Sequence, residues 1–431
     1  MNKILKSSDS DFLKKFHEVV NYDRSEILDV SSVVSEIIKN VRERGDAAVI
    51  EYTSKLDRNN EVQLEVSNDS IEEYIKDVPE DIKDALDLAA ERIKNYHQKQ
   101  LPADQSYQDE NETTLGYFWR AVESVGIYVP GGTASYPSSV LMNAIPAKIA
   151  GVKDVTMVTP FTDGKINPSI MYAAKVAGVT NIYPIGGAQA IAALTFGTET
   201  IKPVNKIVGP GNIYVAEAKR QVSGTVGIDM FAGPSEVVII ADTNNEPKII
   251  AADLIAQSEH DPSAQSILIC NDESLANNVI KEVDDQISNL PRGEIARSSW
   301  DKNGYIIIAN DIDESFNLSN QLAPEHLELL IDNAESYLSK ISNAGAVFLG
   351  KNTPEALGDY IAGPSHVLPT SRSAKFSSGL SVYDFLKKIS LIGCTDKSLA
   401  NLGEAAIKIA TNEGLDGHAR SIEYRLCLLY T

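Results

Sequence analysis

The sequence has little cysteine and no long apolar run. Its three cysteines, Cys270, Cys394 and Cys427, lie far apart and show no Cys-x-x-Cys spacing, so neither a disulfide framework nor a thiolate zinc site is indicated. Residues 1–10 turn polar before the apolar core of a signal peptide can form, and no later apolar run approaches the length of a membrane span. We therefore expect a cytoplasmic protein without membrane contact.

Positive charge is also scarce. Lysine and arginine number 39 against 60 aspartates and glutamates, which gives a formal charge of -21 and a sequence pI near 4.7. Nucleic acids and anionic membranes bind basic patches, so this balance argues against both as partners. The hydrophobic content of 43% is ordinary for a soluble globular protein. A chain of 431 residues is long enough for two principal domains.

The common nucleotide and metal motifs are missing as well. The glycine-rich segments 186–189, 209–212 and 233–236 do not complete the Gly-x-Gly-x-x-Gly fingerprint of a dinucleotide fold, and no Walker A lysine follows a glycine cluster. No His-Glu-x-x-His sequence is present either. Composition and spacing alone therefore identify neither a nucleotide nor a metal.

Residues 126–240 show a regular alternation of short apolar segments and helical patterns. The apolar segments begin near residues 126, 155, 182 and 206, and each ends in glycine or proline. A β-α-β-α order predicts a parallel sheet with helices on its faces. Tight turns at the carboxyl ends of the strands leave backbone N–H groups available, so we expect a ligand crevice at that edge.

A second sheet is predicted further along the chain. Its candidate strands are residues 237–242, 267–270, 305–309 and 344–349, with helical stretches between them. The remaining segments are predicted to be a short helical arm at 1–25, helices at 31–100, a hairpin strand from 115 and a helical tail from about 381.

The six histidines are the first candidates for chemistry. His17 and His97 fall in charged amphipathic helical patterns, where a solvated side chain is expected. Asp359 and His366 lie in segment 358–370, whose glycines and prolines predict a defined loop. Such a loop can present both side chains to a ligand, or its aspartate can cap a helix while its histidine packs, and the segment alone favours neither.

Two further histidines have informative neighbours. Gln257 and His260 share one face at the end of an apolar helical pattern, which suits two ligands of one metal ion, although a histidine placed against the helix dipole explains it equally well. His326 follows Glu325 directly after Pro324, where both side chains at a helix start can reach one cavity. Imidazole titrates near neutrality, so the pair could abstract a proton; a capping Glu and a packed His is the alternative.

The last histidine, His418, lies in the tail near Glu413. Together with Gln257, His260 and Asp359 it would offer a metal two imidazole nitrogens and two oxygens. That mixed set suits Zn²⁺ or, less selectively, Mn²⁺ or Co²⁺. No local metal-binding motif connects the four residues, so the metal site is a hypothesis at this point.

These segments, in this order, resemble the histidinol dehydrogenase family. The matching segments are 128–132, 186–192, 209–212, 217–222, 232–236, 257–260, 323–326, 358–370 and 413–418. No single segment is specific, but together they extend over essentially the whole chain.

The resemblance implies oxidation of L-histidinol through L-histidinaldehyde to L-histidine, a four-electron reaction that reduces two NAD molecules, with one zinc ion per subunit that holds the substrate. It implies zinc ligands at Gln257, His260, Asp359 and His418. It implies catalysis by His326, as the base that takes the alcohol proton, and by Glu325, which activates water at the aldehyde stage. The implied substrate contacts are Ser235, Gln257, His260, His326, Asp359, His366, Glu413 and His418, and the implied NAD contacts are Tyr128, Gln189 and Asn212.

The resemblance also implies a homodimer whose C-terminal segments cross to the partner, so that Glu413 and His418 can complete the other subunit's site. The expected fold is α/β, with two incomplete, doubly wound Rossmann-like domains built on parallel sheets. Residues 26–127 and 237–380 are expected to form the main domain with the metal and catalytic residues, and 128–236 the second domain with the NAD contacts. A helical arm (1–25) and a helical tail (381–431) complete the chain.

Two other functions stay open from the residues alone. In a zinc hydrolase, Glu325 would activate water without any redox cofactor. In a non-catalytic acidic ligand-binding protein, the histidines would be structural.

Overall fold

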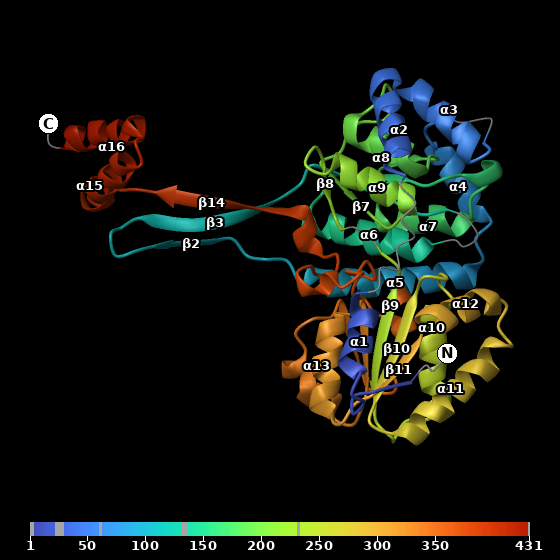
Figure 1. Ribbon diagram of the computed structural model, residues 1–431. Helices are drawn as coiled ribbons and strands as arrows, with labels where there is room; N and C mark the ends of the chain where they lie inside the picture. The colour runs from blue at the N-terminus through green and yellow to red at the C-terminus, as the bar shows by residue number, and fades with distance from the viewer. Residues whose placement is uncertain (1–3, 22–29, 60–62, 132–135, 231–232, 430–431) are drawn as a thin grey trace.

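The structure is a computed structural model of the chain and describes residues 4–21, 30–59, 63–131, 136–230 and 233–429. Two α/β lobes lie against each other, and a long arm projects from them and carries the C-terminal helices at its far end (Figure 1). Gly132 and Ala232, which belong to two of the motifs, and residues 22–25 of the expected N-terminal arm lie outside the described residues. The α/β class with parallel sheets is confirmed.

The first lobe is built on a six-stranded parallel sheet in the order β1-β11-β10-β9-β12-β13. Its strands are β1 (Ile4–Lys6), β9 (Glu236–Ala241), β10 (Gln265–Cys270), β11 (Tyr305–Ile308), β12 (His326–Leu330) and β13 (Ala346–Leu349). Strands β9 and β10 are buried over their whole length, as expected when helices cover both faces of a parallel sheet.

Helices cover both faces of this sheet. Helices α10 (Pro247–Ser258), α11 (Glu273–Ile287) and α12 (Gly293–Asn303) pack on the face that carries Val237 and Ile239. Helices α1 (Phe12–Asn21) and α13 (Ile312–Leu322) pack on the opposite face, with Val238 and Ile240. The alternation follows from the two-residue period of a strand.

The four strands predicted for this lobe are confirmed, but two more strands belong to it. Strand β1 has three residues, which is too few to give a pattern. Strand β12 begins at His326, so the prediction of a helix start at Glu325 and His326 is wrong. Its leucines and glutamate favour a helix by propensity, and pairing with β9 and β13 overrides that preference.

The second lobe contains a five-stranded parallel sheet in the order β6-β5-β4-β7-β8. Its strands are β4 (Ser124–Tyr128), β5 (Asp154–Val158), β6 (Asn181–Tyr183), β7 (Lys206–Val208) and β8 (Gly227–Ile228). The helices that alternate with them are α6 (Pro137–Ala150), α7 (Pro168–Ala177), α8 (Gly187–Phe196) and α9 (Ile213–Val222). The predicted β-α-β-α alternation is therefore confirmed.

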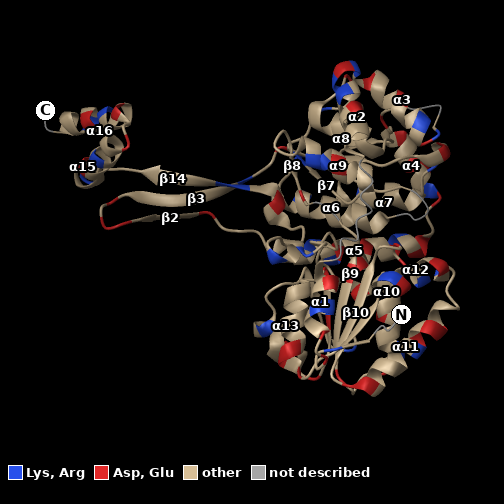
Figure 2. Ribbon diagram, viewed as in Figure 1, with Lys and Arg blue, Asp and Glu red and all other residues tan. Residues whose placement is uncertain are grey.

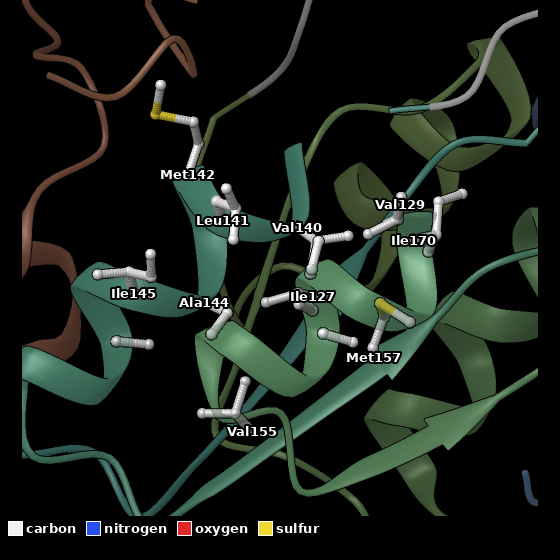
Figure 3. Close-up of a cluster of buried hydrophobic side chains, with 14 of the residues drawn as sticks. Ile127, Val129, Val140, Leu141, Met142, Ala144, Ile145, Val155, Met157 and Ile170 are labelled. Atoms are coloured by element: carbon white, nitrogen blue, oxygen red, sulfur yellow. The ribbon is translucent and has the colours of Figure 1, made fainter. Parts of the chain in front are cut away.

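Figure 3 shows part of the core of this lobe, where side chains of α6 meet those of β4 and β5. Leu141, Ala144 and Ile145 come from the helix, and Ile127 and Met157 from the strands. Helix α6 is apolar on nearly all sides, so its position in the core follows from its sequence.

The helices of residues 31–98 pack on the second lobe. They are α2 (Ser31–Arg44), α3 (Asp46–Leu56), α4 (Asn68–Lys76) and α5 (Glu80–Gln98). Buried residues of α2 and α3 share a cluster with α8 and α9, and those of α4 and α5 share a cluster with α6 and α7. These contacts differ from the expected grouping of 26–127 with 237–380, because an amphipathic helix does not encode which sheet its apolar face will cover.

Helix α5 runs along the boundary between the two lobes (Figure 1). Its Arg92 donates from Nε to the carbonyl of Ile361, at 2.8 Å, in the first lobe. The expectation of a solvated His97 is wrong, because this side chain at the end of α5 is fully buried, with its Nδ1 2.9 Å from Gln100 Oε1. His17 on α1 is exposed, as predicted.

The projecting arm is a three-stranded antiparallel ribbon in the order β14-β3-β2, followed by two helices. The strands are β2 (Gln105–Gln108), β3 (Thr114–Ala121) and β14 (Leu386–Gly393), and the helices are α15 (Asp396–Asn412) and α16 (Asp416–Leu429). The hairpin near residue 115 is confirmed. The tail is helical from Asp396, but its first part is a strand that was not predicted.

Acidic and basic residues alternate along the helices of both lobes (Figure 2). Among the described residues, no helix combines the length and the apolar character that crossing a membrane requires.

Candidate active site

A cavity of about 290 Å³ lies where the two lobes meet. The amino ends of β9 and β12 reach it from the first lobe, and the turns after β4, β7 and β8 reach it from the second. The predicted site residues that line it are Ser235, His260, Glu325, His326, Asp359 and His366. A larger cavity of about 720 Å³ near Arg58 and Phe161 contains none of the predicted residues, so the smaller cavity is the candidate site.

Glu325 and His326 are fixed by the start of β12. Helix α13 ends at Leu322. Ala323 follows in a left-handed conformation with φ of 44°, and the chain then enters the strand through Pro324. Both side chains are buried, at 6% and 4% exposure. His326 Nδ1 lies 3.8 Å from Glu325 Oε2, so the two side chains are neighbours in one buried site.

The main chain of Glu236, at the start of β9, contacts both members of this pair. Its N–H donates to Glu325 Oε2 at 3.0 Å, and its carbonyl lies 3.1 Å from His326 Nδ1. A carbonyl oxygen can only accept a hydrogen bond, so Nδ1 carries the proton and Nε2 keeps its lone pair. Burial lowers the pKa of His326 to about 3, which keeps the ring neutral.

The free nitrogen of His326 points toward a group of acidic side chains. Its Nε2 is buried, has no hydrogen-bond partner in the described part of the chain and lies 3.8 Å from Asp359 Oδ1. Candidate ligand atoms of His260, Glu355 and Asp359 all lie within 4.8 Å of one another. This spacing is compatible with one metal ion among them.

Glu355 belongs to this group, although no motif in the sequence indicates it. Helix α14 (Glu355–Tyr360) places it one turn before Asp359, on the same face. Burial and the negative charge of Asp359 raise the pKa of Glu355 well above its usual value, and burial raises the pKa of Asp359 to about 7. A cation would relieve this crowding of carboxylates. Segment 358–370 is thus a loop only after Tyr360, since Asp359 belongs to the helix.

Gln257 and His260 lie at the end of α10. Gln257 is fully buried, and neither its amide oxygen nor its amide nitrogen has a hydrogen-bond partner among the described residues. An unpaired buried amide costs about 1–3 kcal/mol, which a ligand would recover. His260 is exposed and lines the cavity, but the protein atoms around its ring still lower its pKa by desolvation. The donors present therefore fit a divalent metal.

His366 is held by the first lobe and by the second. Its Nδ1 lies 2.8 Å from the carbonyl of Asp359, so that nitrogen donates, and its Nε2 lies 3.3 Å from Ser139 Oγ on α6. Burial lowers the pKa of His366 to about 4. Within segment 358–370, Asp359 therefore faces the acidic group, and His366 faces Ser139 in the wall of the cavity.

Glu413 and His418 are not brought to this cavity within one chain. Glu413 directly follows α15, and His418 lies in the first turn of α16. Both are exposed at the far end of the arm, where these helices lie (Figure 1).

The three predicted NAD contacts lie at the carboxyl edge of the second sheet. Tyr128 is buried, and its hydroxyl accepts the N–H of Gly187 at 3.0 Å; burial raises the pKa of Tyr128 to about 12. Gln189 in α8 is fully buried, and its amide atoms have no partner in the described residues. Asn212 is exposed and caps α9 by accepting from the N–H groups of Tyr214 and Val215.

A buried ion pair forms the wall of the cavity in the second lobe, and no pattern in the sequence indicates it. Lys219, at 3% exposure, pairs with Asp229 and donates from Nζ to the carbonyl of Gly209 at 3.0 Å. Asp229 Oδ2 accepts the N–H of Gly209 at 2.7 Å. The pair therefore holds both the N–H and the carbonyl of Gly209, whose φ is 109°.

Fold and site together define a two-lobed α/β protein with a buried His/carboxylate centre between the lobes. A family model described as histidinol dehydrogenase matches residues 21–426. Histidinol dehydrogenase 1 of Nostoc sp. is 55% identical over 423 residues, which are 98% of both chains. Histidinol dehydrogenase of Mesorhizobium japonicum is 52% identical over 98% of this chain and 99% of its own. The chain belongs to the histidinol dehydrogenase family, a family of oxidoreductases.

Solved structures agree with this assignment. The crystal structure of histidinol dehydrogenase from Elizabethkingia anophelis superposes with a TM-score of 0.96 at 38% identity, over 100% of this chain and 99% of that one. An acetylating aldehyde dehydrogenase from Geobacillus thermoglucosidasius matches with a TM-score of 0.50 at 15% identity, over 90% of this chain and 98% of that one. The second likeness concerns the fold alone.

Proposed function

We propose that the protein oxidises L-histidinol through L-histidinaldehyde to L-histidine, with NAD as the oxidant and zinc as the metal that positions the substrate. The observation that carries the proposal is the buried Glu325 and His326 pair beside the cluster of His260, Glu355 and Asp359, in a chain of this family. The relatives' names supply the substrate, and the residues in the cavity supply the chemistry.

Gln257, His260, Asp359 and His418 are the proposed zinc ligands. The unpaired amide of Gln257 and the close approach of His260 to Asp359 support the first three. When bound, zinc would act as a Lewis acid that holds the imidazole and amino nitrogens of the substrate. Glu355 would lower the net positive charge of the loaded site, and the bound cation would favour the ionised forms of both Glu355 and Asp359.

His326 and Glu325 carry the proposed proton transfers. The lone pair on His326 Nε2 would take the hydroxyl proton of the alcohol. The carboxylate of Glu325 would orient the water that adds to the aldehyde and take a proton from it. Ser235 and His366 line the same cavity and are proposed to contact the substrate, together with Glu413.

Tyr128, Gln189 and Asn212 are the proposed contacts of NAD, which would accept the hydride from the substrate carbon. The unpaired buried amide of Gln189 supports this role, because a bound nucleotide would offer it a partner. Asn212 uses its oxygen to cap α9, so its amide nitrogen is the atom that stays available for a ligand.

We also propose a homodimer in which the arm of each subunit reaches the other. The arm exposes large apolar side chains that a partner would cover, among them Ile392 at 72%, Tyr424 at 66% and Leu428 at 75% exposure. Glu413 and His418 would then complete the site of the partner subunit.

The primary test is to mix protein, NAD and L-histidinol and to follow the absorbance of NADH. About two NADH should form per histidinol consumed, and a chelator should abolish turnover until zinc is restored. If no NADH forms from histidinol, the proposed reaction is refuted. This is the result that a hydrolase or a non-catalytic binding protein would give. Activity that survives thorough zinc removal would refute the metal assignment alone.

Mixed dimers test the crossing of the arms. Subunits with His260→Asn and subunits with His418→Asn should each be inactive, but mixed dimers should regain one intact site, which combines the wild-type His260 of one chain with the wild-type His418 of the other. A mixture that stays inactive, although mass spectrometry detects mixed dimers, would show that the tail does not act on the partner.

A further inference from the structure

The main chain of Glu236 touches both proposed acid-base residues, although neither the motif that contains Glu236 nor the family resemblance gives it a role. We propose that Glu236 and Arg372 act as a positioning unit that holds Glu325 and His326 in working orientation and connects them to helix α1. This inference rests on the proposed function of that pair and concerns what keeps it in place.

The first observation is the double contact at the start of β9. The N–H of Glu236 fixes the carboxylate of Glu325, and its carbonyl fixes the protonated nitrogen of His326, at 3.0 and 3.1 Å. One peptide segment thus sets the direction of the carboxylate and the tautomer of the imidazole together. A displacement of this segment would disturb both groups at once.

The second observation is that the side chain of Glu236 is anchored by Arg372. The carboxylate of Glu236 is buried at 1% side-chain exposure, and Arg372 Nη1 lies 3.2 Å from its Oε1. Arg372 Nη2 also donates to Gln265 Oε1, at 2.6 Å, at the start of β10. A planar guanidinium can hold two acceptors on neighbouring strands in a fixed geometry, which an ammonium group cannot do.

The third observation is that Arg372 also reaches the end of α1. Its Nε and Nη2 each lie 3.4 Å from a carbonyl of this helix, those of Val20 and Val19. A cation is favourable at a helix C-terminus, where carbonyl groups lack intrahelical partners. The N-terminal helix therefore contributes to the surroundings of the same guanidinium that anchors Glu236.

The fourth observation is backbone strain at this anchor. Ser371 and Arg372 have φ of 52° and 67°, and such conformations in residues other than glycine cost about 1–3 kcal/mol each where surrounding contacts impose them. The loop is pressed against Gly233, whose N–H donates to Thr370 Oγ1 at 2.6 Å. A side chain at Gly233 would collide with Ser371 Oγ, at 1.9 Å from an added Cβ. The left-handed backbone of this turn thus places Arg372 beside Glu236.

The variants Arg372→Asn, Arg372→Lys and Glu236→Gln test the inference, with Ser371→Gly as the matched control. Asparagine tolerates the left-handed backbone while removing the guanidinium. Ser371→Gly keeps the turn, because glycine adopts the same positive φ without strain, and it leaves the ion pair in place. For Arg372→Asn we expect kcat for NADH formation to fall about 10–100-fold, with KM within about threefold, since supporting residues of a site have effects of this size. Arg372→Lys should recover only part of the loss, and Glu236→Gln should show a smaller fall.

Two readouts separate positioning from a general loss of structure. The zinc content and the thermal unfolding midpoint of Arg372→Asn and Glu236→Gln should stay near those of Ser371→Gly. The ¹⁵N signals of labelled histidine should show His326 as the Nδ1-protonated tautomer in the wild type and as a mixture in Arg372→Asn. Unchanged kcat and tautomer in both Arg372→Asn and Glu236→Gln would overturn the inference, as would a fall in kcat that only tracks lost zinc or lost fold. If the wild type made no NADH, the proposed function would fail, while the tautomer measurement would still decide the role of Arg372.

Discussion

Replacing Lys219 by methionine would remove the positive end of a buried ion pair at the cavity wall. The side chains of Lys219 and Asp229 are 4% and 1% exposed, so neither charge is hydrated to a useful extent. Methionine keeps most of the apolar stem, and the cavity left behind is small. The change therefore isolates the charge and its hydrogen bond to Gly209.

The expected loss of stability follows from the charge of Asp229, which stays buried after the substitution. Removing one partner of a buried ion pair costs about 3–5 kcal/mol, because the other charge stays buried without compensation. Asp229 keeps the N–H of Gly209 as a donor, so we expect a loss near the lower limit, about 3 kcal/mol. In the double variant Lys219→Met/Asp229→Asn the buried charge is gone, and at least about 1 kcal/mol should be recovered relative to the sum of the single changes.

Urea unfolding at fixed protein concentration and zinc content measures these differences. The control is Lys175→Met, which breaks the exposed pair with Glu72, at 52% and 56% side-chain exposure in the same lobe, and should change stability by less than about 0.5 kcal/mol. A Lys219→Met protein as stable as this control, or strictly additive single changes, would contradict the role assigned to the pair.

Other predictions concern residues of the candidate site and the pH dependence of the protein's stability. His326→Asn should lower turnover about 10²–10⁴-fold and leave zinc bound, whereas His260→Asn should lose zinc, as metal analysis of both purified proteins would check. Glu325→Gln should slow oxidation of added L-histidinaldehyde more than the first alcohol step in single-turnover assays; equal losses would argue against water activation. Burial raises the pKa of Asp57 to about 6, so the folded state holds a proton that the unfolded state has lost, and wild-type stability falls as pH rises from about 4 to 6. Asp57→Asn should remove this fall, a gain of about 1 kcal/mol at pH 7.5 after solvent screening is allowed for; a gain independent of pH would contradict it.

Much of the fold could be predicted because its signals are local. The apolar strands and helices of residues 126–222 alternate with glycine and proline at each strand end, and the structure places them as expected. The strand at His326–Leu330 could not be predicted, since its residues favour a helix until β9 and β13 pair with it. Likewise, nothing in residues 31–98 indicates which sheet their apolar faces cover.

In the candidate site, too, the sequence indicates some residues, and only the tertiary structure identifies the others. Residue types and family motifs were sufficient to select Glu325, His326, Asp359 and His260, and the structure places all four along one cavity. They did not indicate Glu355, which joins the acidic group through the turn of α14, nor the anchoring of Glu236 by Arg372, which connects residues 136 positions apart.

The sequence by itself therefore determined the parallel sheets, the acidic character and the kinds of side chain available for proton transfer and metal binding. Only the tertiary structure decided that His326 Nε2 carries the lone pair, because the carbonyl of Glu236 occupies Nδ1. It also decided that His418 lies at the end of an arm, away from the cavity of its own chain. Periodicity and motifs are properties of neighbouring residues, whereas tautomers, shared charge and the completeness of a site depend on contacts that form when distant segments pack.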